Sequence, residues 1–358
     1  MAEPATIVKC LVWDLDNTLW QGTLLEDAEV TLAEPVRRLI AELDSRGVLQ
    51  AVASKNDHDP AWQRLEALGV AEFFVLPHIG WGPKSDSVRA IAAELNFALD
   101  TIAFVDDQPT ERAEVAFHLP EVRCYDARRL AVLDELPEFS PPTVTVDARR
   151  RREMYQAGFR RKAAETDFQG PSEEFLRSLE LVMHIRRASG TELSRVEELT
   201  LRTSQMNATG VHYSLPDLRA LLADPRHEVL VATLADRFGP HGAVGLELLA
   251  KHERVWHLKL LATSCRVVSF GAGSVILGRL VDEAARAGVH LVADFRRTER
   301  NRMMEIAYRM TGFTDEACGC AAELAAPAEE GVQRLHLHPT PQAPPPTMEL
   351  HAVSLRDG

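Results

Sequence analysis

The chain is poor in cysteine, has no long hydrophobic run and carries no excess of basic residues. Its five cysteines among 358 residues are an odd number without the spacing of a disulfide framework, and only Cys318 and Cys320 lie close together. No apolar run is long enough to span a bilayer, and no signal peptide stands out at the beginning of the sequence. We therefore expect a protein of the reducing cytoplasm, without a membrane partner.

The charge balance is acidic. The 40 Lys and Arg residues stand against 53 Asp and Glu residues, which gives a formal net charge of -13 at pH 7. This balance argues against nonspecific binding of nucleic acid by the whole surface. The length of 358 residues exceeds what one hydrophobic core usually holds, so we expect two domains.

The most informative stretch has two carboxylates, Asp14 and Asp16, directly after the apolar run 10–12. Side chains two positions apart point to the same side of a strand, so both can converge on one ligand at its carboxyl end. A carboxylate that attacks phosphorus needs a divalent cation against charge repulsion and an acid to protonate the leaving oxygen. Asp14 and Asp16 can divide these tasks. The alternative interpretation is that both are turn residues.

Two further segments carry polar residues, one at the end of a predicted strand and one just before a predicted helix. Ser54 ends the predicted strand 49–54 and is followed by Lys55 and Asn56, side chains suited to hydrogen-bonding a phosphoryl oxygen. Lys84 stands just ahead of a helical pattern, where its charge can hold a nucleophile and a phosphoryl group together. Alternatively, Ser54 is a helix cap and Lys84 a solvated surface residue.

A second carboxylate pair, Asp106 and Asp107, ends another apolar strand. Hard oxygen ligands at a strand end suit Mg²⁺, which takes one or two carboxylates and keeps several waters. The order of carboxylate pair, serine, lysine and carboxylate pair resembles the four motifs of the haloacid dehalogenase (HAD) superfamily of phosphohydrolases.

That resemblance implies a doubly wound parallel α/β sheet with Mg²⁺ as cofactor. It implies that Asp14 is the nucleophile that becomes an aspartyl phosphate. Asp16 is then the general acid and base, and its main-chain carbonyl reaches the metal. Ser54 and Lys84 bind the phosphoryl group.

The same resemblance makes Asp106 a metal ligand. Asp107 is either a further ligand at the metal or a neighbour that orients waters or Lys84. Four loop residues complete the implied substrate-binding set of this half: Asn17, Thr18, Lys55 and Asn56. Thr18 is equally a candidate for a structural cap.

HAD enzymes that act on small metabolites commonly carry an inserted cap domain. Here the span 20–35 has room only for a flap, and the span 56–84 holds one helix and a strand. We therefore expect a capless core with an open site. Such a site favours a bulky or protein-borne substrate, because another molecule must help to exclude water.

The chain organisation follows from pattern and composition. Strands alternate with helices from about Ile7 to Tyr125, as in a doubly wound sheet. We predict a HAD-like core over 1–140, a basic helical linker over 141–180, a second domain over 181–325 and an extended or disordered proline-rich tail over 326–358. The basic helix is either a solvated connector or a docking surface.

The second domain resembles an N-acetyltransferase (GNAT) fold. Its predicted elements are a strand over 181–185, a helix over 193–201, a strand over 229–234 and a hairpin of 243–249 with 255–261.

In the GNAT fold, a strand leads into a glycine-bearing loop that binds a pyrophosphate. Arg266 and Gly271 fit that loop as binding residues, but Ser269 occupies its first glycine position. Coenzyme A, a phosphopantetheine arm or no ligand remain as alternatives.

A HAD core, a basic helix and a GNAT-like half together resemble the FkbH-like family, HAD subfamily IIIC, over roughly residues 7–320. The supporting segments are 14–20, 54–56, 104–109, 202–207 and 264–266. The resemblance implies natural-product (polyketide) biosynthesis. It further implies that a glyceryl or similar phospho-hydroxyacyl unit from 1,3-bisphosphoglycerate is loaded onto the thiol of an acyl carrier protein and that its remaining phosphate is removed.

One departure bears on that assignment. Some relatives have a cysteine between the two aspartates of the first motif, where this chain has Leu15, which cannot form a thioester. Cys265 is a candidate substitute or a small core residue, and Cys10 is expected to be structural. Three hypotheses remain: a bifunctional glyceryltransferase and phosphatase, a phosphatase acting on a small or carrier-bound intermediate, and a noncatalytic carrier-binding module.

Overall fold

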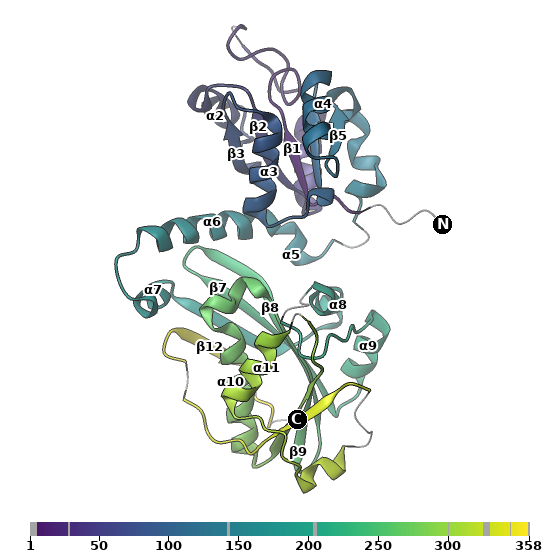
Figure 1. Ribbon diagram of the computed structural model, residues 1–358, viewed down its shortest axis with the longest axis vertical. Helices are drawn as coiled ribbons and strands as arrows, with labels where there is room; N and C mark the ends of the chain where they lie inside the picture. Colours follow the sequence, from purple (N-terminus) through teal and green to yellow (C-terminus); the bar gives the residue numbers. More distant parts are fainter. Residues whose placement is uncertain are drawn as a thin grey trace. The chain divides into compact units, whose positions relative to one another are not determined.

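The computed structural model in Figure 1 has two compact units, Met1–Gln156 and Ala157–Gly358. It describes residues 6–27, 29–141, 144–202, 206–299, 301–324, 330–343 and 345–356. The side chains of residues 201, 202 and 265 also lie outside this description. No helix of the described residues is long and apolar enough to cross a membrane.

The first unit is built on a five-stranded sheet in which all strands are parallel. Its strands, in the spatial order β3-β2-β1-β4-β5, are β1 (Cys10–Trp13), β2 (Leu49–Ser54), β3 (Phe74–Ile79), β4 (Ile102–Asp106) and β5 (Arg123–Asp126). The strands β1, β2 and β4 are buried along their whole length. Burial of this kind is expected for parallel strands with both faces covered.

Helices connect these strands: α1 (Glu34–Ser45), α2 (His58–Ala67), α3 (Lys84–Leu95) and α4 (Pro109–His118). Right-handed crossovers place α1 and α2 on one face and α3 and α4 on the other. Accordingly, α3 packs against α4, and α1 packs against the 3₁₀ segment η3 (Ala127–Glu135). The apolar stripe of α1 consists of Leu39, Ile40 and Leu43, at the spacing that turns side chains to one face. The predicted doubly wound sheet is confirmed.

The strand order reverses its direction between β1 and β4. The chain runs from β1 outward to β3 and then returns to place β4 on the other side of β1. In open α/β sheets this switch point leaves a crevice at the carboxyl ends of the strands, where ligands bind. Between β1 and α1, the described residues of 14–33 form turns and two isolated bridges, with no inserted domain. A core without a cap, as predicted, leaves this crevice open.

The second unit holds a seven-stranded mixed sheet in the order β11-β10-β9-β8-β7-β6-β12. Its strands are β6 (Leu181–Arg187), β7 (His227–Asp236), β8 (Gly239–Lys251), β9 (Val255–Thr263), β10 (His290–Phe295), β11 (Gln333–Leu337) and β12 (Met348–Ala352). β6 to β9 are antiparallel, whereas β10 joins β9 and β12 joins β6 in parallel. The predicted hairpin is β8 with β9, and the predicted strands 181–185 and 229–234 lie in β6 and β7.

The helices of this unit are α7 (Ser172–Ser178), α8 (Leu193–Arg202), α9 (Leu215–Ala223), α10 (Ala272–Ala287) and α11 (Arg302–Thr311). The buried face of α10 joins the main core through Ile276, Leu277 and Leu280. It approaches β8 closely at Gly245, where a Cβ atom would lie 2.5 Å from Cδ1 of Ile276. Any side chain at this position would require Ile276 to move. The unit has the α+β architecture that was predicted for the second half.

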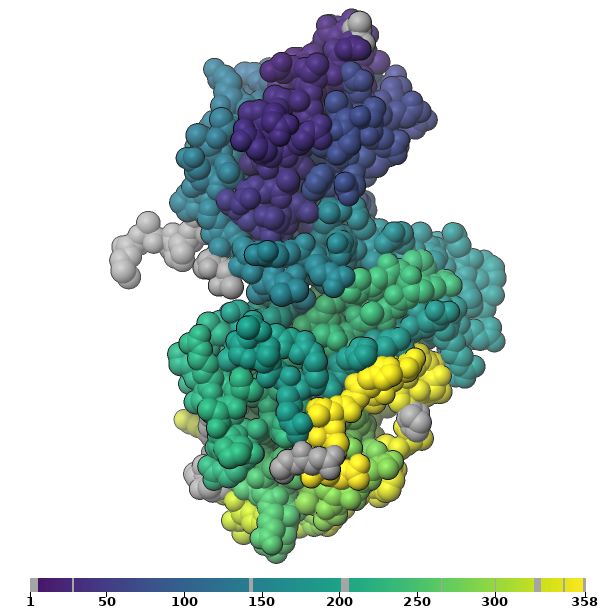
Figure 2. Space-filling model, turned by 180° about the vertical axis from the view of Figure 1, so that it is seen from behind, coloured from purple at the N-terminus to yellow at the C-terminus, as the bar shows by residue number. Residues whose placement is uncertain are grey.

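The prediction of an extended or disordered tail after residue 325 is wrong for the described part of it. That part contributes β11 and β12, one at each edge of the second sheet. Figure 2 shows the last residues, in yellow, lying along the surface of the second unit. Met348 and Leu355 are buried in its core, so their burial holds the segment in place despite its prolines.

The basic segment consists of the short helix α5 (Val146–Arg149) and the long helix α6 (Arg151–Asp167). In the first unit, Arg152 forms an ion pair of 2.9 Å with Asp44. In the second unit, Arg161 pairs with the buried carboxylate of Asp236. Each of these two arginines therefore forms an ion pair within its own unit. This favours a connecting helix over a docking surface.

Candidate active site

Two carboxylates and a lysine meet at the switch point of the first sheet. Asp14 follows β1, Asp106 ends the neighbouring β4, and Lys84 begins α3. The Nζ atom of Lys84 lies 2.7 Å from Oδ1 of Asp14 and 2.5 Å from Oδ2 of Asp106. All three residues are buried, with 3%, 0% and 3% of the surface of Asp14, Asp106 and Lys84 exposed. Three segments that are far apart in sequence thus form one charged cluster.

The cluster has a surplus of negative charge. Burial raises the pKa of Asp14 to about 6; Lys84 opposes this shift, and the nearby Asp106 adds to it. Burial also raises the pKa of Asp106, again against the effect of Lys84. Burial alone would lower the pKa of Lys84, but the two carboxylates outweigh it and raise that pKa. The single ammonium of Lys84 therefore neutralises the two carboxylates only in part, and a further cation would stabilise their charged forms.

Thr18 links the loops after β1 and β4. Its hydroxyl accepts a 2.9 Å hydrogen bond from the main-chain N–H of Asp107 and lies 3.3 Å from Oδ2 of Asp14. The Asp107 carboxylate is only partly buried, but burial and the charge of Asp14 raise its pKa. Thr18 therefore holds the carboxylate loops together, whichever of its two predicted roles it has.

A Mg²⁺ site fits the residues that meet here. One oxygen from each of Asp14, Asp106 and Asp107 can be chosen so that all lie within 4.8 Å of one another. Carboxylate oxygens are preferred ligands of this hard cation, and the unbalanced charge of the cluster favours a divalent ion. The side chain of Asp16 lies outside this group. The part of Asp16 predicted to reach the metal is its main-chain carbonyl, and that role stays a prediction.

The carboxylate of Asp16 is held by three N–H donors. Oδ1 accepts hydrogen bonds from Nε1 of Trp20 at 2.8 Å and from the main chain of Leu24 at 3.0 Å. Oδ2 accepts one from Nδ2 of Asn56 at 3.0 Å, and the same amide lies 3.3 Å from Oγ of Ser54. Ser54 and Asn56 are therefore brought together with Asp16 at the carboxyl end of β2.

Two predicted binding residues have their polar atoms engaged within the protein. Lys55 forms a 2.7 Å ion pair with Glu111 at the start of α4. Asn17 has a positive φ of 54°, and its Oδ1 accepts a hydrogen bond from the main chain of Gly22. Contact of either side chain with substrate stays a prediction.

Sequence reasoning missed Arg112 and Gln108, which fix the position of Asp106. Nη1 of Arg112 donates to the main-chain oxygen of Asp106 at 2.6 Å, and its Nη2 pairs with Asp126 at 2.7 Å. The main-chain N–H of Gln108 donates to Oδ1 of Asp106 at 2.7 Å. Asp126, the partner of Arg112, could have been noticed in the sequence. It ends the fifth strand at the same sheet edge as Asp106.

A cavity of about 410 Å³ adjoins the cluster, with Thr18 and Asp107 among its lining residues. Its size lies in the range of small-molecule pockets. Apolar side chains from the loop after β1, from α1 and from η3 form most of the remaining wall, including Leu19, Trp20, Val36, Leu130 and Ala131. Arg128 supplies a cation at the rim, where it pairs with Asp126. The cavity can therefore hold a group with apolar parts beside the carboxylates.

The second unit contains the other residues predicted to bind substrate. Arg266 lies in the 3₁₀ segment η6 (Cys265–Phe270), where its Nε donates to Oγ of Ser264 at 3.4 Å. Gly271 starts α10 with a φ of 70°, and a Cβ atom there would meet no neighbour within 4 Å. The side chain of Cys265 lies outside the described part. The binding roles of all three residues stay predictions.

Residues 206–208 cover the part of β9 that β10 leaves free. The N–H of Thr263 donates to the oxygen of Met206 at 2.8 Å, and the N–H of Ala208 donates to the oxygen of Leu261 at 3.0 Å. On the other side, Arg296 donates its N–H to Ala208. This chain segment, and not a ligand, therefore satisfies these main-chain groups. The residues 203–205 of the motif that resembles the FkbH-like family lie outside the described residues.

Solved structures similar to this chain include both hydrolases and acetyltransferases. The N-terminal part of a Bacteroides fragilis protein, which contains a phosphatase domain complexed with Mg, is 28% identical over 38% of this chain and 40% of its own, with a TM-score of 0.34. A HAD-superfamily hydrolase from Ehrlichia chaffeensis is 10% identical over 34% of this chain and 87% of its own, with a TM-score of 0.28.

On the acetyltransferase side, a variant of the Vibrio cholerae spermidine N-acetyltransferase is 15% identical over 43% of this chain and 92% of its own, with a TM-score of 0.31. No protein-family model matches the chain, and no curated protein matches it. The chain covers less than half of the Bacteroides protein.

Proposed function

We propose that this protein is a magnesium-dependent phosphohydrolase of the HAD type, with Asp14 as the nucleophile. The observation that carries the proposal is the meeting of Asp14, Lys84 and Asp106 at the carboxyl ends of β1 and β4. The Lys84 ammonium lies between two buried carboxylates at the open switch point of the sheet, and this arrangement suits the binding of a phosphoryl group.

In the first step, a carboxylate oxygen of Asp14 attacks phosphorus, and the bond from phosphorus to the ester oxygen breaks. Asp16 gives a proton to the leaving oxygen, so the product leaves as an alcohol. Lys84 lies against Asp14 and is placed to offset negative charge as the phosphoryl group approaches. Bound Mg²⁺, held by Asp14, Asp106 and Asp107, would lower the repulsion between the two anions.

In the second step, water attacks the phosphorus of the aspartyl phosphate. Asp16 takes a proton from that water, the bond from phosphorus to Asp14 breaks, and inorganic phosphate leaves. Trp20, Leu24 and Asn56 keep the Asp16 carboxylate in one orientation through both steps. The cycle returns both aspartates to their starting state.

We further propose that the substrate is a phospho-hydroxyacyl unit, such as the glyceryl unit of 1,3-bisphosphoglycerate, destined for an acyl carrier protein. Three features support a carrier-borne substrate: the resemblance of the motifs to the FkbH-like family, the absence of a cap over the described site, and the adjoining cavity. The cavity offers apolar walls beside the metal site, as a group larger than phosphate requires.

A phosphatase without acyl transfer is the second candidate, and the position of Leu15 favours it. Leu15 is fully buried in the core of the first unit and offers no nucleophile. Cys10 is also fully buried, and burial raises the pKa of Cys124 to about 11, so neither described cysteine of this unit is suited to form a thioester. Glyceryl transfer would then require Cys265 or direct attack by the carrier thiol.

The test combines phosphate release with intact-protein mass spectrometry. The protein is incubated with Mg²⁺, 1,3-bisphosphoglycerate and an acyl carrier protein bearing its phosphopantetheine arm. We expect phosphate release that stops in Asp14→Asn and on removal of Mg²⁺ by EDTA. Asp59→Asn is the matched control, because that exposed aspartate on α2 lies outside the cluster. Release that persists in Asp14→Asn would overturn the assignment of the nucleophile.

The same experiment separates the two candidates. A glyceryl adduct on the carrier, with or without one on Cys265, supports transfer. Phosphate release without either adduct supports the phosphatase alone. A Cys265→Ser variant then shows whether any adduct on the carrier depends on that thiol.

A further inference from the structure

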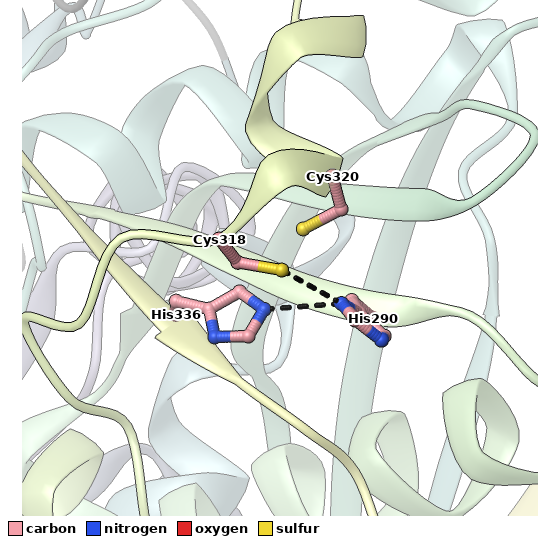
Figure 3. A group of neighbouring side chains, drawn as sticks. All are labelled: His290, Cys318, Cys320 and His336. Carbon is pink, nitrogen blue, oxygen red and sulfur yellow. Dashed lines mark hydrogen bonds between the residues drawn. The ribbon is translucent and has the colours of Figure 1, made fainter.

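Two cysteines and two histidines converge in the second unit, far along the chain from the carboxylate cluster. They are His290 at the start of β10, Cys318 and Cys320 around the 3₁₀ segment η7 (Gly319–Glu323), and His336 in β11. One ligand atom from each residue can be chosen so that all four lie within 4.8 Å of one another. Figure 3 shows both sulfur atoms and both rings turned toward a common point.

The distances match the edges of a tetrahedral zinc site. With Zn–N bonds of about 2.0 to 2.1 Å and Zn–S bonds of about 2.3 Å, such a site has N···N edges of about 3.3 Å and N···S edges of about 3.6 Å. Nε2 of His336 lies 3.2 Å from Nδ1 of His290, and Sγ of Cys318 lies 3.4 Å from the same nitrogen. The two edges at Nδ1 of His290 therefore have the lengths that a tetrahedral zinc site requires, and the remaining distances stay within 4.8 Å.

Hydrogen bonding satisfies these four side chains only in part. Nδ1 of His290 faces both Sγ of Cys318 and Nε2 of His336, but a ring nitrogen has either one hydrogen or one lone pair to share between them. A single cation would satisfy all four at once, because each ligand atom can give it a lone pair.

We propose that His290, Cys318, Cys320 and His336 bind one structural Zn²⁺ ion. Two thiols release their protons on binding, and the resulting thiolates neutralise the charge of the ion. The soft sulfur and imidazole ligands select zinc over the hard Mg²⁺ proposed for the first unit. Four protein ligands leave no open position, so the site is structural and not catalytic.

The ion would join η7 to β10 and β11, two strands that already pair with each other in the sheet. Cys320 and Leu324 pack against Val255 and Val292 in a small separate core. On the surface, Glu323 accepts hydrogen bonds from Arg254. The metal would add a link from this segment to β10 and to β11, the edge strand of the sheet. Its role would therefore be to hold η7 against these two strands.

A nearby histidine provides a built-in control. The ring of His338 lies 4.1 Å from that of His290 and 4.7 Å from that of His336, between ring centres, but His338 is exposed and is not part of the converging group. Removal of His338 is therefore expected to leave the metal in place. Removal of Cys318 or Cys320 is expected to release it.

The experiment measures zinc in the full-length protein, purified without chelator, by inductively coupled plasma mass spectrometry. We expect about one zinc per chain in the wild type and in His338→Ala and Cys124→Ser, and loss of that zinc in the Cys318→Ser/Cys320→Ser double variant. Cys124 is the matched cysteine control, because it is half-buried in the first unit.

Cobalt exchange gives a second readout that does not depend on the variants folding. The wild type, stripped of metal and loaded with Co²⁺, should show a thiolate-to-cobalt charge-transfer band and the intense visible bands of tetrahedral cobalt. Absence of zinc from the purified wild type, together with octahedral cobalt spectra, would overturn the proposal. So would a mass that shows Cys318 and Cys320 joined in a disulfide in the native protein.

Discussion

The hydroxyl of Thr18 accepts a 2.9 Å hydrogen bond from the main-chain N–H of Asp107, 89 positions further along the chain. The same hydroxyl lies 3.3 Å from Oδ2 of Asp14. One side chain therefore sets the spacing of two loops that carry the carboxylates of the cluster.

This relationship predicts that Thr18→Val weakens the metal site while the fold remains. Valine keeps the shape of threonine but leaves the part-buried N–H of Asp107 without its Thr18 acceptor, at a cost of about 1 kcal/mol. We expect about a tenfold loss of kcat/KM at limiting Mg²⁺, a change equivalent to about 1.4 kcal/mol. Phosphate release measured across a Mg²⁺ titration checks this, with Thr18→Ser expected to restore activity. Equal activity in Thr18→Val would show that the bridge is dispensable.

The cavity beside the site predicts a change in substrate recognition without a change in chemistry. Ala131 is exposed and lines the cavity, so Ala131→Trp should fill part of it. We expect a several-fold rise in KM for a phosphorylated acyl substrate and little change in kcat for a small phosphate ester. Val132→Trp is the matched control on the same 3₁₀ segment, because Val132 does not line the cavity. If the wild type, Ala131→Trp and Val132→Trp have the same KM, the cavity is not part of the substrate site.

The buried pair of Glu247 and Arg279 predicts a pH dependence of the stability of the second unit. Burial raises the pKa of Glu247 to about 7 from an ordinary value of 4.5, and Arg279, 3.8 Å away, opposes the shift only in part. The folded state thus binds the proton more tightly than the unfolded state does. This contribution to stability is complete below about pH 4.5 and is lost as the pH rises through about 7.

The loss amounts to about 3 kcal/mol at one pKa unit per 1.36 kcal/mol. Urea unfolding across that pH window, followed in wild type and Glu247→Gln, measures it. The free energy of unfolding should fall more steeply in the wild type, since the glutamine cannot titrate. Parallel curves would mean that Glu247 titrates at its ordinary value.

The C-terminal segment predicts a measurable stability effect far from any site. Leu355 is fully buried in the core of the second unit, so Leu355→Ala should lower its free energy of unfolding by about 2 to 5 kcal/mol. Glu349→Ala, at an exposed position of β12, should change it little. Thermal unfolding of both variants checks this. A segment that did not pack on the unit would leave Leu355→Ala as stable as the control.

How far the sequence predicts the molecule depends on the range of the forces involved. Local periodicity was sufficient for β1, β2, β4 and the hairpin of β8 and β9, because alternating or continuous apolar runs are read directly from neighbouring residues. It failed for β11 and β12. Their stretch is rich in proline, and their pairing partners lie elsewhere in the chain, so the favourable burial of Met348 and Leu355 is invisible locally.

The candidate site divides in the same way. The amino-acid sequence is enough to identify the chemical groups that the first unit offers, since Asp14, Lys84 and Asp106 stand at the ends of recognisable elements. Three features appear only in the folded molecule: these three side chains meet, Asn56 binds Asp16, and two cysteines lie next to two histidines. These contacts depend on which strands become neighbours, and that choice is made by burial summed over the whole fold and not by any short segment.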